Sequence, residues 1–102
     1  MTDKEKLFFD RSDRFIHLAN EQINEGIKAG QVSTAFMYGL ARYTAWFTAS
    51  GWTTAKDMAD AKAETIDFFV TEYRQMLELN MDDYINQFDE YIQTSEKIQQ
   101  QR

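Results

Sequence analysis

One charged side chain, Arg42, lies between Lys28 and Lys56 in a chain whose residues are 27% charged. Within that interval, segment 32–50 is apolar or small on nearly every side of a helix. A helix that is apolar all round is normally buried by neighbours on several sides. A lone guanidinium there requires a partner, because an unpaired buried charge is expensive. The sequence therefore predicts a central helix in which Arg42 is the most informative residue.

The length and composition are those of one globular domain. The chain has 102 residues with 43% hydrophobic content, so we expect a single helical domain over residues 1–102. It contains no cysteine, which excludes disulfides, thiol nucleophiles and thiolate metal sites and suits a cytoplasmic protein. The first ten residues lack the continuous apolar core of a signal peptide. Arg42 and several hydroxyl side chains interrupt segment 32–50, so we expect no membrane span.

The charge is negative and unevenly distributed. The net charge is −6, and most of the acidic excess follows residue 56. An acidic domain repels phosphate backbones and anionic lipid surfaces. We therefore expect neither nucleic acid nor membrane as a partner.

The proline and glycine content of the sequence is typical of helices with short connections. There is no proline and there are only four glycines. We expect an all-α fold, a small bundle of three to four antiparallel helices at approximately residues 4–29, 32–50, 54–79 and 82–98. Asn80 is the predicted end of the third helix and Asp82 the cap of the fourth. Alternatively, these two helices form one rod with a kink near Asn80.

Capping residues give the other predicted helix ends. Gly30 is placed as a left-handed C-cap, and Gly51 as a second C-cap glycine. Ser33 is the predicted N-cap of the second helix, and Thr53 or Thr54 that of the third.

Apolar side chains at helical spacing predict the core. The residues expected to share it are Phe36, Leu40, Tyr43, Phe47, Phe69 and Tyr73. The second helix also has a side of small residues on which another backbone can pack closely. This apolar surface exceeds what about three neighbouring helices cover, and such surplus marks partner sites.

Several strings of residues resemble one bacterial family. They are 15–22 (FIHLANEQ), 32–38 (VSTAFMY) with 41–43 (ARY), 73–77 (YRQML), and 81–85 (MDDYI) followed by Phe88. In this order, over residues 8–90, they are similar to the domain-of-unknown-function family numbered 3144, short proteins mostly from proteobacteria. The resemblance implies a bacterial origin and supplies no activity, cofactor or catalytic residue.

Tyr38, Arg42 and Trp46 are the candidate site. They are four residues apart and form one ridge of the second helix. A functional interpretation is a guanidinium held between two rings to meet an anion or a partner's carboxylate. The preferred interpretation is an internal tie between helices, in which Arg42 meets Glu21, Asn20 or an acid of the third helix, with Glu21 as the first choice of partner. Trp52, just after the second helix, is either a loop anchor or a binding contact.

No other residues indicate chemistry. Asp13, His17 and Glu21 lie on one side of the first helix, but a di-iron site needs a second histidine, and the chain has one. A solvated charged face is preferred there, including an Asp10–Arg14 pair. We therefore expect no metal, no cofactor and no catalytic residues.

Three classes of function follow, in order of preference. The first is a non-catalytic interaction or structural protein that uses apolar helical surface, possibly as a homodimer. The alternative is a module centred on Arg42 that binds a small anion or small molecule. The third is an enzyme of unidentifiable class.

Overall fold

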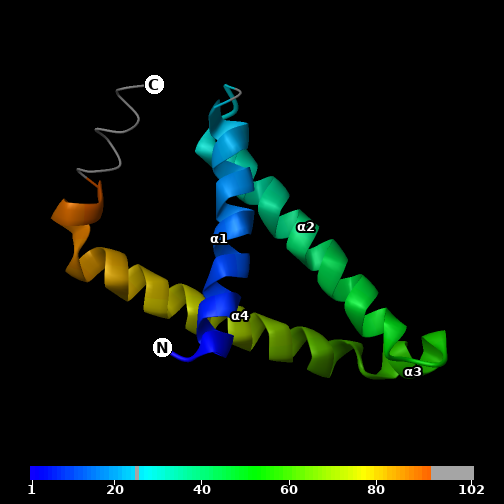
Figure 1. Ribbon diagram of the computed structural model, residues 1–102. Helices are drawn as coiled ribbons and strands as arrows, with labels where there is room; N and C mark the ends of the chain where they lie inside the picture. The colour runs from blue at the N-terminus through cyan, green and yellow to red at the C-terminus, as the bar shows by residue number, and fades with distance from the viewer. Residues whose placement is uncertain (25, 93–102) are drawn as a thin grey trace. The chain divides into compact units, whose positions relative to one another are not determined.

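The computed structural model of the chain describes residues 1–24 and 26–92 (Figure 1). Its elements are α1 (Asp3–Asn24), α2 (Ala29–Ser50), α3 (Ala55–Asp60) and α4 (Lys62–Asn86), and residues 88–92 are also helical. None of the described residues lies in a strand, so the predicted all-α class is confirmed. The chain divides into two compact units, Met1–Thr53 and Thr54–Arg102, which are described in turn.

The first unit consists of α1 and α2, which meet beside the segment that joins them (Figure 1). The ring of Phe15 in α1 lies 6.4 Å from that of Phe36 in α2, measured between centroids. Val32, in the first turns of α2, is 5% exposed and is the one buried residue in the described part of the chain. Burial in this unit is thus concentrated where α2 begins.

The connection between α1 and α2 lies earlier than predicted. Gly26 takes the left-handed conformation, with φ 89°, and its N–H donates to the Ile23 carbonyl at 3.0 Å. Glycine adopts this backbone region without a Cβ penalty, so Gly26 supplies the turn assigned to Gly30. Placing Gly30 and Ser33 at helix ends is wrong, because both lie inside α2. The Lys28 N–H instead donates to Oε1 of Gln31 at 3.1 Å, which satisfies one free donor near the helix start.

The end of α2 lies where Gly51 predicts it, in a different conformation. Gly51 is the C-cap residue, with φ −89° and ψ −7°, which is right-handed. The Gly51 N–H donates to the Thr48 carbonyl at 3.1 Å, and the Trp52 N–H to the Ala49 carbonyl at 3.1 Å. A tight last turn therefore ends the helix without a left-handed residue.

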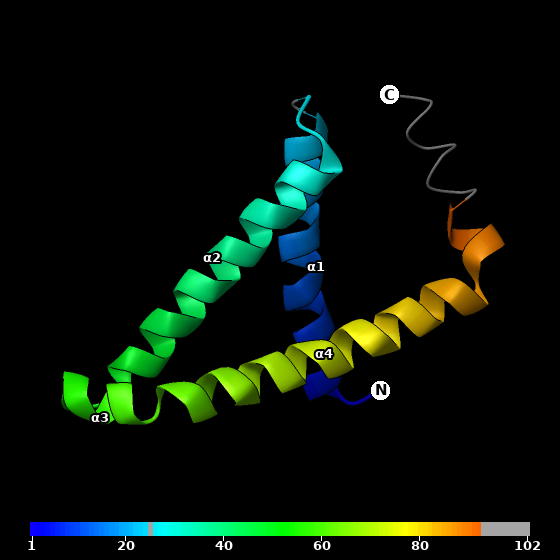
Figure 2. The same cartoon turned by 180° about the vertical axis from the view of Figure 1, so that it is seen from behind.

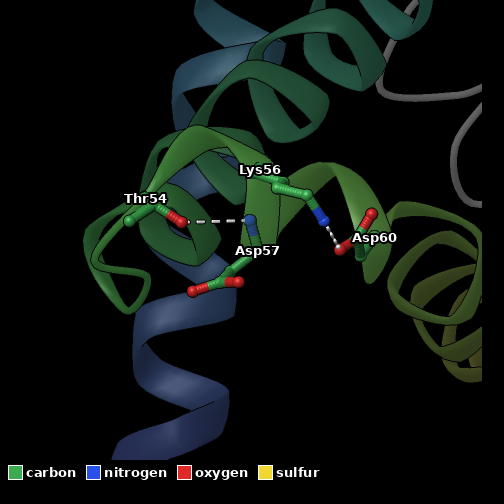
Figure 3. A network of polar contacts seen from close by, with 4 residues as sticks. All are labelled: Thr54, Lys56, Asp57 and Asp60. Atoms are coloured by element: carbon green, nitrogen blue, oxygen red, sulfur yellow. Dashed lines mark hydrogen bonds and ion pairs between the residues drawn. The ribbon is translucent and has the colours of Figure 1, made fainter.

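The second unit begins with α3, whose start has a side-chain cap (Figure 3). Oγ1 of Thr54 accepts a hydrogen bond from the Asp57 N–H at 3.1 Å, so Thr54 is the cap rather than Thr53. The Lys56 ammonium lies 3.0 Å from the Asp60 carboxylate, one turn later. A single turn residue, Ala61, separates α3 from α4. Alanine is the strongest helix former, so helix propensity gives no reason for this break.

Of the two alternatives near Asn80, the structure has the single helix, because α4 runs through Asn80 to Asn86 (Figures 1 and 2), and the helix end predicted at Asn80 is wrong. Asn80 donates from Nδ2 to the Met76 carbonyl at 2.8 Å, so its side chain bonds to its own helix instead of interrupting it. Asp82 lies inside α4 and caps nothing. The helix ends at Gln87, whose N–H donates to the Asp83 carbonyl at 3.1 Å. The predicted helical residues 93–98 lie outside the described residues.

Neither unit by itself buries its share of the predicted core. Phe36, Leu40, Tyr43 and Phe47 are each more than two-fifths exposed, and Tyr73 of α4 is also exposed. Phe69 is half-buried within its own unit. The periodicity identifies the apolar faces, and within each unit taken alone these faces are open.

Candidate functional site

The candidate site lies on α2, which carries seven large, exposed apolar side chains. Their exposed fractions range from 42% to 69%, and the residues are Phe36, Met37, Tyr38, Leu40, Tyr43, Trp46 and Phe47. The helix contains no acidic residue and one basic residue, Arg42. Exposed apolar surface of this extent is unusual on a monomer and marks interaction sites.

A shallow, open depression lies on this helix around Gly39. Its lining residues are Tyr38, Gly39, Arg42, Tyr43 and Trp46. The rings of Tyr43 and Trp46 lie 5.6 Å apart, so they support each other along one edge. A Cβ added at Gly39 would meet nothing within 4 Å. The floor of the depression is therefore open because residue 39 has no side chain.

A second shallow depression continues along the same helix toward its start. It is lined by Lys28, Gly30, Gln31, Thr34, Ala35 and Tyr38. Thr34 turns its hydroxyl to the Gly30 carbonyl at 3.0 Å, which leaves its methyl group on the surface. Tyr38, which is 69% exposed, separates the two depressions.

Arg42 does not pair with Glu21, the first choice of partner. Among residues 1–24 and 26–92 three ion pairs form, and Arg42 is in none of them. Oε1 of Glu21, the predicted partner, instead lies 3.1 Å from Nε2 of His17. Arg42 is exposed and lines the Gly39 depression. Within the described residues, its guanidinium is thus open to solvent and to a ligand or partner.

The structure brings three of the four predicted site residues together. Tyr38, Arg42 and Trp46 line one depression, as their spacing of four predicts. Trp52 follows the end of α2, is 42% exposed and does not line that depression. Sequence reasoning missed Gly39 and Tyr43 as lining residues. A glycine in the middle of a helix was the available signal, since it costs stability there.

The remaining titratable groups form local pairs on exposed helix faces. Asp10 pairs with Lys6 at 3.2 Å, so the predicted pair with Arg14 is wrong. No group of three His, Cys, Asp or Glu residues suited to a metal ion occurs among the described residues. Near the end of the described chain, desolvation and then the Asp83 carboxylate raise the pKa of the Tyr91 phenol above its ordinary value.

The comparisons with known proteins decide the family. The model described as "Protein of unknown function (DUF3144)" matches residues 8–85. The chain belongs to this family. It is also similar to a protein of solved structure, "NMR structure of the protein NB7890A from Shewanella sp", at 43% sequence identity and a TM-score of 0.73. That match covers 85% of this chain and 92% of the other.

These comparisons confirm the resemblance seen in the sequence and supply no activity. A search of curated proteins found no match. No helix in the described part of the chain is long and apolar enough to cross a membrane. The function must therefore be argued from the surface of the DUF3144 chain itself.

Proposed function

We propose that this DUF3144 chain is a non-catalytic interaction protein that self-associates through the apolar surface of α2. One observation carries the proposal. Along the 22 residues of α2, only Val32 is buried, while the large apolar side chains that follow it are left uncovered by the rest of their own unit, Met1–Thr53. Covering apolar surface contributes about 25 cal/mol per Å², so an uncovered surface of this kind favours association.

The charge pattern supports an interaction function for α2. Acidic residues occur in α1, α3 and α4 and are missing from α2. Charged residues are depleted at the centre of protein interfaces, and Tyr, Trp, Met and Arg are enriched there. Tyr38, Arg42, Tyr43 and Trp46 are all of these enriched types. The composition of α2 therefore resembles the middle of an interface.

The experiment is the molar mass of the wild-type chain in solution. Sedimentation equilibrium over about 1 μM to 500 μM spans the range in which weak and tight dimers separate. We expect the mass to approach twice the 12.0 kDa of one chain as concentration rises. A mass of one chain across the whole range, for a protein shown to be helical by circular dichroism, would contradict self-association.

The exposure of Arg42 favours a second candidate, a site for a small anion. Arg42 lines an open depression and forms no ion pair with the described residues. Calorimetric titration with inorganic phosphate tests it, with Arg42→Gln as the matched variant. Heat that saturates in the wild type and disappears in Arg42→Gln would support this candidate over the first. Equal heats in the two proteins would eliminate it.

A further inference from the structure

We draw no further inference here: the strongest candidate, the apolar face of α2 around the Gly39 depression, lies open within its own unit, and nothing in the structure shows what covers it.

Discussion

Helices α2 and α4 are of similar length and differ in how they meet solvent. The 25 residues of α4 include six acidic and two basic side chains, spread along the helix. The 22 residues of α2 include one charged side chain and a mid-helix glycine. A helix with charges throughout is solvated without help, whereas an apolar helix requires a cover. The contrast teaches that α2, rather than α4, is the element whose sequence requires a partner.

The largest expected effect concerns the one buried residue. Val32→Asp places a carboxylate where the side chain is 5% exposed, and we expect it to lower the free energy of unfolding by about 3 kcal/mol or more. Val70→Asp in α4 is the matched control, because Val70 is exposed. Urea titration measures both. Equal losses of the free energy of unfolding in the two variants would show that a carboxylate is tolerated no worse at the start of α2 than on the exposed surface of α4.

The second-largest effect is expected on the self-association of the chain. Trp46→Ala removes a side chain that is 63% exposed, and we expect its dimer dissociation constant to rise roughly 30-fold, as for an interface hot spot. Phe68→Ala in α4 removes one that is 59% exposed and should change the constant less than about threefold. Sedimentation equilibrium compares them. A larger change for Phe68→Ala would move the interface to α4.

A cap substitution in the second unit is expected to act on stability alone. Thr54→Ala removes the acceptor of the Asp57 N–H and should cost about 1 kcal/mol in free energy of unfolding. Its dimer dissociation constant should match the wild type. Thr54→Ser keeps an acceptor and should retain most of the stability. Weakened association in Thr54→Ala would show that this unit contributes to the interface.

The smallest effect is expected at the His17–Glu21 pair. Both side chains are exposed, and exposed pairs contribute about 0.2 to 1 kcal/mol. We expect His17→Ala to shift the melting temperature by less than about 2 °C, and EDTA to leave it unchanged. A rise of several degrees when Zn²⁺ is added to the wild type, absent in His17→Ala, would instead indicate a metal site in α1.

The sequence predicts the helical class and the site better than the helix ends. Spacing of four places Tyr38, Arg42 and Trp46 on one side of α2, and the structure agrees because helical geometry alone decides it. Gly26 lies inside the predicted first helix, residues 4–29, so the sequence pattern does not distinguish it as the turn residue that the structure shows. Asn80 is a weak breaker and bonds to its own helix instead. The break at Ala61 has no sequence signal.

The partner of Arg42 was the least predictable feature. A buried guanidinium requires an acid, which predicts Glu21 as its partner, but Arg42 is exposed within its unit and Glu21 lies beside His17, four residues away. A local pair within one helix needs no tertiary contact, so it competes well with a pair between helices. The burial of α2 stays a prediction, since Val32 is its one buried residue in the described structure.

Hydrogen exchange at two protein concentrations tests the central claim most directly. The wild-type chain is labelled above and below its dimer dissociation constant, and mass spectrometry follows peptides from α2 and α4. The account predicts that peptides of α2 exchange more slowly at the higher concentration while those of α4 exchange at the same rate. Slower exchange confined to α4, or no concentration dependence in α2, would contradict it.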